Sequence, residues 1–268
     1  MAFRKKKKII AAKSPEQLQA MQAAGEIVGR ALQAVRDAAG PGVTTLELDA
    51  IAEDVIRSAG AVPAFKGYQG FPGSICSSPN DMIVHGIPAE DVVLRDGDLL
   101  SVDCGAILDG WVGDSAWTFG IGTLADEHHR LNEATAWVLD EGIKAMVPGN
   151  RLTDVSWALE EATARAEEKF GVPLHIVDGY GGHSIGRAMH EDPYLPNEGD
   201  PGHGPKIVEG SVLAIEPMLA LGTPDSTVLA DEWSVVTADG SYSSHWEHTV
   251  AATAEGPRIL TPRTHRGR

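Results

Sequence analysis

The chain has 268 residues, enough to bury a sizeable core as one large domain or two small ones. Its formal net charge is −16, yet nine of its 22 Lys and Arg lie in two terminal stretches, 4–8 and 257–268, so the remainder carries a net charge of −25. Such an acidic body repels a phosphate backbone, which excludes general DNA binding.

The basic run from Arg4 to Lys8 leaves two interpretations open, a solvated flexible arm and a transient contact with ribosomal RNA. The two cysteines, Cys76 and Cys104, form no CxxC motif, which suits a reducing compartment. No apolar run approaches the ~20 residues of a membrane span, and Ile9 to Ala12 is too short for the core of a signal peptide. We therefore expect a cytoplasmic protein with no membrane partner.

The first predicted elements are two helices. Ser14-Pro15-Glu16-Gln17 combines a capping box with Pro at the first helical position, and Gly40-Pro41-Gly42 ends the helix that begins there. Thr44 with Glu47 opens a second helix that runs towards Gly60.

This order of elements recurs later in the chain. A helix is predicted from Leu131 to Met146, ended by Pro148-Gly149, and another from about Thr153 to Phe170. The pair Pro148-Gly149 thus repeats Pro41-Gly42, at the end of the first helix of each half.

Two candidate strands repeat in the same way. Two segments each consist of a Gly, a β-prone apolar run and a carboxylate: Gly97 to Asp103, and Gly210 to Glu216. Each is followed by another acid expected on a strand, Asp114 or Glu247. The sequence therefore predicts an internal duplication and an α/β (α+β) fold, with antiparallel strands inside and helices outside. A site between the halves would be lined by carboxylates from both.

A hairpin positions the first two carboxylates. Asp109-Gly110 at the centre of a two-residue turn pairs Gly105 with Asp114 and Asp103 with Ala116. Asp103 and Asp114 then share a face, with backbones about 7–8 Å apart. Two solvated strand acids would fit this pattern, but so would two metal ions ~3.5–4 Å apart.

Three further features favour the metal site. His183 lies in the Gly-rich segment from Gly179 to Gly186, and Glu216 ends an apolar run, where an unpaired carboxylate is costly to bury. Glu247 lies in a β-prone segment, on one face with Thr249. Each alone fits a loop histidine or an ordinary strand acid, but chance is a poor explanation for all of them in this order.

These motifs resemble methionine aminopeptidases of the bacterial type I form over Ser14 to Leu260. The residues that carry the resemblance are Val84-His85-Gly86-Ile87-Pro88, Asp103, Asp114, Gly182-His183, His190-Glu191-Asp192-Pro193, Glu216-Pro217-Met218 and Glu247-His248-Thr249. The resemblance implies the pita-bread fold, with two pseudo-twofold-related halves. It implies one catalytic domain over 14–260, a basic arm over 1–13 and a basic tail over 261–268. The short stretch from Glu216 to Glu247 leaves no room for the inserted subdomain of type II enzymes.

The same resemblance implies that Asp114 and Glu247 bridge two divalent metal ions. Asp103 would hold one ion, and His183 with Glu216 the other; this donor set suits cobalt, manganese, iron or zinc. A metal-activated water would hydrolyse the initiator methionine from nascent proteins whose second residue is small, and Glu216 would shuttle the proton.

Substrate contacts are implied in the same way. His190 would bind the scissile carbonyl oxygen and His85 would lie near the scissile amide, whereas from the bare sequence each reads as a loop histidine. The methionine pocket would be lined by Tyr68, Phe71, Cys76 and Trp233. Met189 stands where the family often has an aromatic residue.

Two rival functions stay open. One is an Xaa-Pro aminopeptidase or prolidase of the same fold, although those usually carry an extra N-terminal domain. The other is a non-catalytic pita-bread binding protein, which five filled ligand positions argue against. We expect a monomer.

Overall fold

The computed structural model describes residues 9–263, so residues 1–8 of the predicted arm and 264–268 of the predicted tail lie outside the described residues. The described chain contains four α-helices and a short 3-10 helix, η1 (Tyr68–Gly70). The α-helices are α1 (Pro15–Ala38), α2 (Thr45–Ser58), α3 (Asp126–Lys144) and α4 (Leu152–Phe170). None of the helices within 9–263 is long and apolar enough to cross a membrane.

The strands form four sheets, and every pair within the described residues is antiparallel, as predicted. One sheet contains β1 (Val62–Pro63), β4 (Leu99–Leu108), β2 (Ile75–Pro79) and β5 (Trp111–Gly120). The largest sheet contains, in this spatial order, β15 (Gly256–Ile259), β14 (His248–Thr253), β9 (Val212–Ile215), β7 (Gly181–Ser184) and β8 (Glu191–Pro196). Two small sheets are β13 (Ser243–His245) with β10 (Met218–Ala220) and β6 (His175–Ile176), and β11 (Ser226–Val228) with β12 (Val235–Thr237) and β3 (Met82–Val84).

The helix starts follow the capping signals. Ser14 and Thr44 each form the predicted capping box, so the starts of α1 and α2 are confirmed. The predicted start of the third helix at Leu131 is wrong, because α3 begins at Asp126. Its first turn is polar and carries Asp126 and Glu127, which favour a helix N-terminus but show no apolar periodicity.

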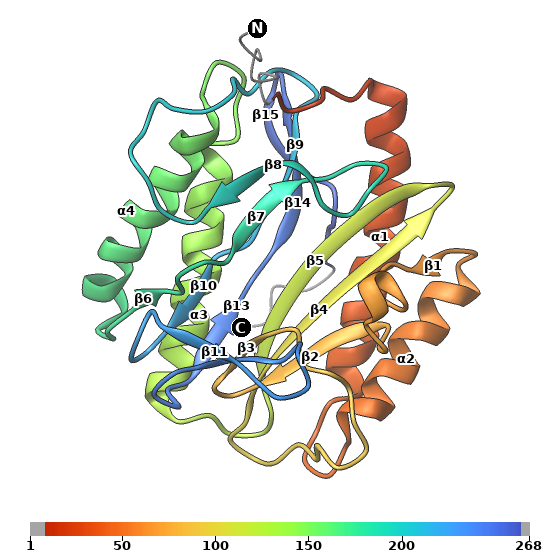
Figure 1. Cartoon of the computed structure of the whole chain (residues 1–268), viewed down its shortest axis with the longest axis vertical. Helices are drawn as coiled ribbons and strands as arrows, with labels where there is room; N and C mark the ends of the chain where they lie inside the picture. The colour runs from red at the N-terminus through yellow and green to blue at the C-terminus, as the bar shows by residue number, and fades with distance from the viewer. Residues whose placement is uncertain (1–8, 264–268) are drawn as a thin grey trace, which may run out of the picture.

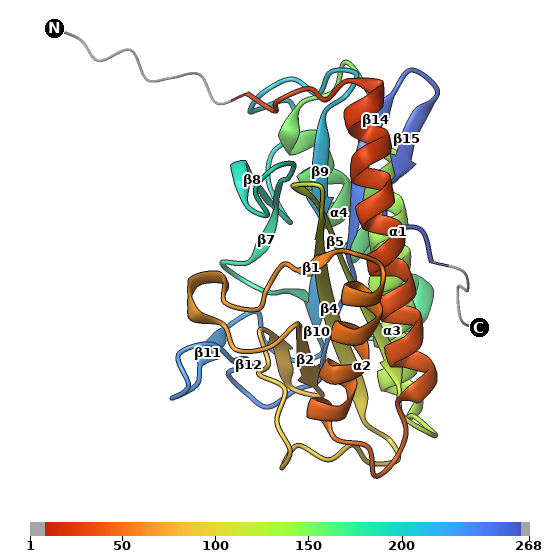
Figure 2. The same cartoon turned by 90° about the vertical axis from the view of Figure 1, so that its right-hand side faces the viewer.

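The duplication is visible in the order of elements. Helices α1 and α2 precede the long strands β4 and β5, and α3 and α4 precede β9 and β14 in the same way. In Figure 1 α1 and α2 flank the strands on one side and α3 and α4 on the other. Figure 2 shows α1, α2 and α3 to the right of β4, β5 and β9, and β7, β8, β11 and β12 to the left. The predicted architecture of two halves, with strands inside and helices outside, is confirmed.

The last described segment packs closely on α1. A Cβ at Gly25 would lie 2.1 Å from the carbonyl oxygen of Leu260, and one at Gly29 would lie 2.1 Å from that of Pro262. No side chain fits in either space, so glycine is needed for the segment to approach the helix. The segment thereby carries Arg263 to the helix-covered side of the site.

Candidate active site

The β4–β5 hairpin carries the first two acids with the predicted register. Gly105 pairs with Asp114, and Asp103 pairs with Ala116. A Cβ at Gly105 would lie 3.3 Å from Asp114 Oδ1 and 2.8 Å from the Phe65 ring. Glycine at this position therefore leaves room for the Phe65 ring and the Asp114 carboxylate.

The second half contributes Glu247, although not from within a strand as predicted. Glu247 lies between β13, which ends at His245, and β14, which begins at His248. Its N–H donates to the carbonyl oxygen of Ala116 (3.0 Å) on β5 instead of extending a strand of its own half. The β-prone residues around Glu247 favour a strand, but the chain here crosses from one sheet to the other.

Hydrogen bonds join the halves around the site. The Thr249 hydroxyl donates to the carbonyl oxygen of Asp114 (2.8 Å), and the Ser115 hydroxyl donates to that of Glu247 (2.6 Å). These buried bonds fix the backbones of Asp114 and Glu247 relative to each other. Carboxylates from both halves therefore meet at one place.

His183 completes this group from β7. A Cβ at the preceding Gly182 would lie 2.2 Å from the carbonyl oxygen of Ala214, so glycine allows β7 to approach β9. His183 Nδ1 lies 3.1 Å from the carbonyl oxygen of Ser184, to which it can donate only if it carries the ring proton. His183 Nε2 then points its lone pair at the carboxylates, 3.5 Å from Glu216 Oε1.

The geometry of the cluster fits a divalent metal. One ligand atom each of Asp114, His183 and Glu247 lie within 4.8 Å of one another, and all three residues are buried. Among the described residues, Asp103 Oδ1, Asp114 Oδ1 and Glu247 Oε1 are buried without a hydrogen-bond partner, which is costly unless a cation faces them.

The electrostatics support the same conclusion. Burial raises the pKa of Asp103 to about 7, and burial together with repulsion from other carboxylates raises the pKa of Asp114 and Glu247 well above the ordinary range. Burial alone raises the pKa of Glu216 in the same direction. A bound cation would offset both the burial and the repulsion.

His85 and His190 lie in the same cavity but differ in setting. His85 has a left-handed backbone (φ 61°), rare for a side chain with a Cβ, and burial lowers its pKa to about 4. The next residue holds this turn, because the Gly86 N–H donates to Ser78 Oγ (3.1 Å). His190 Nδ1 lies 3.0 Å from the Tyr68 hydroxyl, and its ring centroid is 4.3 Å from that of His183.

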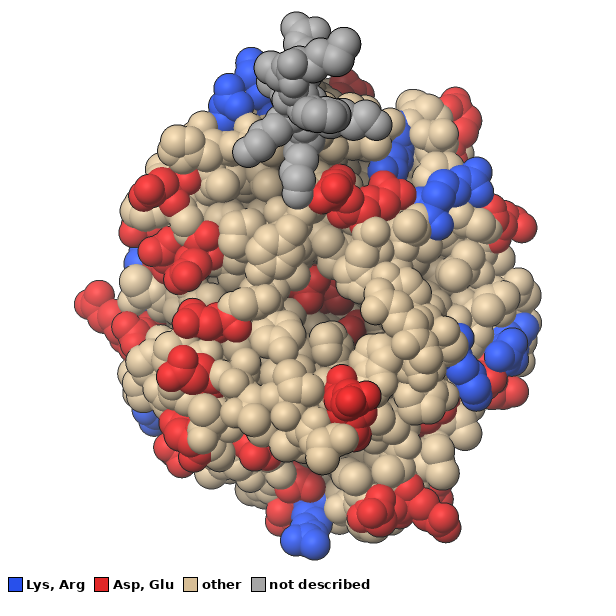
Figure 3. Space-filling view, in the orientation of Figure 1, with Lys and Arg blue, Asp and Glu red and all other residues tan. Residues whose placement is uncertain are grey.

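A cavity of about 230 Å³ brings all the predicted site residues together. Figure 3 shows a hollow near the middle of one face, with carboxylates at its floor. The predicted residues that line this cavity are Tyr68, Phe71, Cys76, His85, Asp103, Asp114, His183, His190, Glu216, Trp233 and Glu247. Phe71 and Trp233 meet edge to face at 5.1 Å, and Cys76 pairs with Asp103 across β2 and β4, so the apolar wall adjoins the carboxylates.

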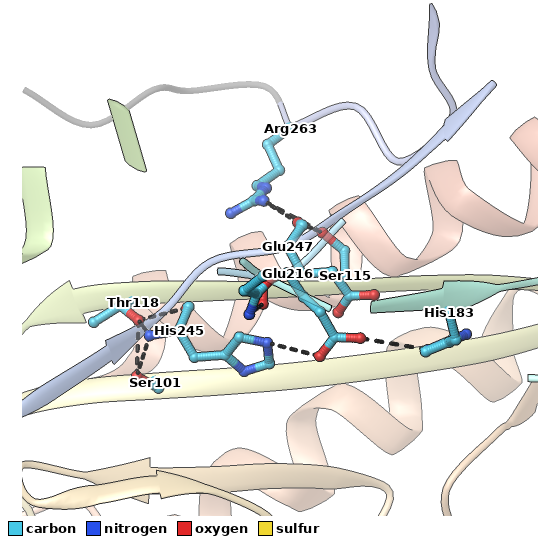
Figure 4. A network of polar contacts seen from close by, with 9 residues as sticks. Ser101, Ser115, Thr118, His183, Glu216, His245, Glu247 and Arg263 are labelled. Carbon is cyan, nitrogen blue, oxygen red and sulfur yellow. Dashed lines mark hydrogen bonds and ion pairs between the residues drawn. The ribbon is translucent and has the colours of Figure 1, made fainter. Parts of the chain in front are cut away.

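The cavity also contains residues to which the sequence analysis assigns no catalytic, metal-binding or substrate-binding role. Phe65, Met189 and His245 also line the cavity. Figure 4 shows His245 beside Glu216, and Arg263 behind Glu247, where it donates to the Glu247 carbonyl oxygen (2.6 Å). The Arg263 guanidinium also lies over the rings of Trp117 and Trp246, 5.3 and 5.1 Å from their centroids. His245, two residues before Glu247, was the one whose position could have suggested a role.

The chain is similar to known metallopeptidases along most of its length. The model of metallopeptidase family M24 matches residues 19–254. The curated methionine aminopeptidase 1 of Mycobacterium tuberculosis is 59% identical over 255 residues, which cover 95% of this chain and 96% of the relative. Methionine aminopeptidase 1 of Bacillus subtilis is 46% identical over 94% of this chain and 99% of its own.

Solved structures give the same result. The methionine aminopeptidase of Rickettsia prowazekii has a TM-score of 0.90 at 34% identity, over 95% of this chain and 100% of its own. The prolidase of Pyrococcus furiosus has a TM-score of 0.72 at 20% identity, and the match covers 96% of this chain but 66% of the prolidase, a likeness of fold alone. The family model and the relative that is 59% identical over nearly its whole length show that the chain belongs to metallopeptidase family M24 and, within it, to the methionine aminopeptidases.

Proposed function

We propose that the chain removes the initiator methionine from nascent proteins whose second residue is small, using two divalent metal ions held by Asp103, Asp114, His183, Glu216 and Glu247. The observation that carries the proposal is the buried group of carboxylates and imidazole, with unpartnered oxygens, at the floor of an apolar cavity. When bound, the ions supply a water of lowered pKa and polarise the scissile carbonyl. Asp114 and Glu247 would each hold both ions.

The chain's own residues would do the rest of the chemistry. If the Tyr68 hydroxyl donates to His190 Nδ1, the ring proton of His190 lies on Nε2, which is then free to donate to the developing oxyanion. His85 would contact the leaving amide nitrogen. The buried Glu216 carboxylate would take a proton from the attacking water and return it to the departing amine.

Substrate selection would come from the apolar end of the cavity. Tyr68, Phe71, Cys76 and Trp233 would enclose the methionine side chain, together with Met189, whose buried thioether contributes a flexible wall. A bulky second residue would displace the scissile carbonyl, and a shift of about 1 Å already costs 10²-fold in rate. We therefore infer a preference for small second residues.

A peptide panel tests this function. The full chain is incubated with Met-Ala-Ser, Met-Lys-Ser and an Ala-Pro peptide, with Mn²⁺, Fe²⁺, Co²⁺ or Zn²⁺ added in turn. We expect free methionine from Met-Ala-Ser at least about 10²-fold faster than from Met-Lys-Ser, because the lysine side chain would displace the scissile carbonyl. Faster cleavage of the Ala-Pro peptide would instead indicate an Xaa-Pro peptidase. No cleavage of any peptide would favour a binding protein.

We further propose that the protein acts as a monomer in the cytoplasm, where nascent chains still carry their first methionine. Cys76 and Cys104 are both free thiols, which suits a reducing compartment. Transient contact with the ribosome through the basic stretch 4–8 belongs to the same proposal.

A further inference from the structure

The Glu216 carboxylate lies between two histidines. Its Oε1 is 3.5 Å from His183 Nε2, and its Oε2 is 3.4 Å from His245 Nε2. Figure 4 shows the two imidazoles on opposite sides of this carboxylate. His183 is part of the proposed ligand set, whereas His245 has no role in it.

His245 Nε2, like several carboxylate oxygens of the site, is a buried polar atom without a hydrogen-bond partner among the described residues. Within the described residues, His245 Nε2 is buried and makes no hydrogen bond, and the same holds for Asp103 Oδ1. Asp103 and His245 are close enough for a direct electrostatic interaction. Because a buried ring nitrogen without a partner is unfavourable, His245 Nε2 calls for a partner inside this cavity.

The backbone of His245 is held in place from both strands of the hairpin. Its N–H donates to Thr118 Oγ1 (3.0 Å) on β5 and to Ser101 Oγ (3.3 Å) on β4, and the Thr118 hydroxyl lies 2.7 Å from its carbonyl oxygen. His245 therefore cannot easily turn away from the cavity. These bonds fix the backbone of His245 at the edge of the cavity that its ring lines.

We propose that His245 is a further metal ligand, which joins Asp103 on the side of Glu216 that faces away from His183. The inference rests on the proposed two-metal function and adds an imidazole to the ion held by Asp103. Each ion would then have one imidazole ligand. Imidazole suits zinc, iron and copper, whereas purely carboxylate sites suit manganese and magnesium, so His245 would shift the preference of this position.

The number of ligating imidazoles can be counted in the Co²⁺-loaded full chain by proton NMR. The paramagnetic ion shifts the exchangeable N–H resonances of coordinated imidazoles far from the rest of the spectrum. We expect two such resonances, one lost in His245→Gln and the other in His183→Gln. We also expect His245→Gln to weaken binding of one of the two Co²⁺ ions by at least about tenfold.

A matched control is His190→Ala, which alters a cavity histidine outside the ligand set and is expected to keep both resonances. Two bound Co²⁺ ions with one shifted imidazole resonance in the unsubstituted chain would overturn this ligand assignment alone. This result is measured on the unsubstituted chain, so it does not depend on whether a variant folds. A chain that binds no Co²⁺ would overturn the proposed metal function itself.

Discussion

Asp114→Asn is expected to leave a folded chain that is nearly inactive and short of metal. The substitution keeps the size of the side chain but removes the charge that two close cations would share. Metal catalysis contributes several kcal/mol of transition-state stabilisation, so we expect methionine release to fall by roughly 10³-fold or more. Elemental analysis of the purified variant, together with methionine release from Met-Ala-Ser, measures both effects.

The control for this variant makes the same chemical change outside the site. Asp109 lies in the turn of the same hairpin with φ 50°, a conformation that asparagine also adopts. Asp109→Asn should therefore keep both metal content and activity. Full activity of Asp114→Asn with two ions still bound would show that Asp114 does not bridge them.

The second large effect is expected for His190→Ala. The variant should keep its metal content, because the proposed ligand set does not include His190, yet kcat should fall by roughly 10²–10³, the usual effect of losing one oxyanion donor. His183→Ala should instead weaken metal binding itself. Metal titration by calorimetry, followed by steady-state kinetics at saturating metal, distinguishes the two histidines.

His203→Ala serves as the control, since His203 lies in an exposed turn that contributes nothing to the cavity. Its metal affinity and kcat should match those of the unsubstituted chain. If His190→Ala and His183→Ala lose metal to the same extent, the separate roles proposed for the two histidines are wrong.

The parts of this structure that sequence predicted are those fixed by local chemistry. The Asp109-Gly110 turn sets the register of β4 and β5 down to the pair Gly105 and Asp114, because a two-residue turn allows one alignment. The capping boxes at Ser14 and Thr44 set helix starts in the same way. The repeat of Gly, apolar run and carboxylate predicts that carboxylates from both halves line one site, and Asp103 and Glu216 do line the same cavity.

Features that depend on contacts between distant segments could not be predicted. Glu247 leaves its own sheet because its N–H bonds to Ala116 in the other half of the chain, and no local pattern encodes that crossing. His245 ends β13 two residues before Glu247, but this spacing alone does not show that its side chain lines the cavity. The position of Arg263 behind Glu247 depends on Gly25 and Gly29, which accept the C-terminal segment only once α1 is folded.

The dependence of methionine release on two bound metal ions can be measured by titrating the metal-free chain with a divalent ion. The chain is stripped with EDTA, and Mn²⁺, Fe²⁺, Co²⁺ or Zn²⁺ is returned stepwise while free methionine from Met-Ala-Ser is measured. We predict no release from the stripped chain, and a rise with added metal that ends when two ions are bound per chain. Release that continues unchanged in excess chelator, or no release with any of the four metals, would show that the chain is not a two-metal methionine aminopeptidase.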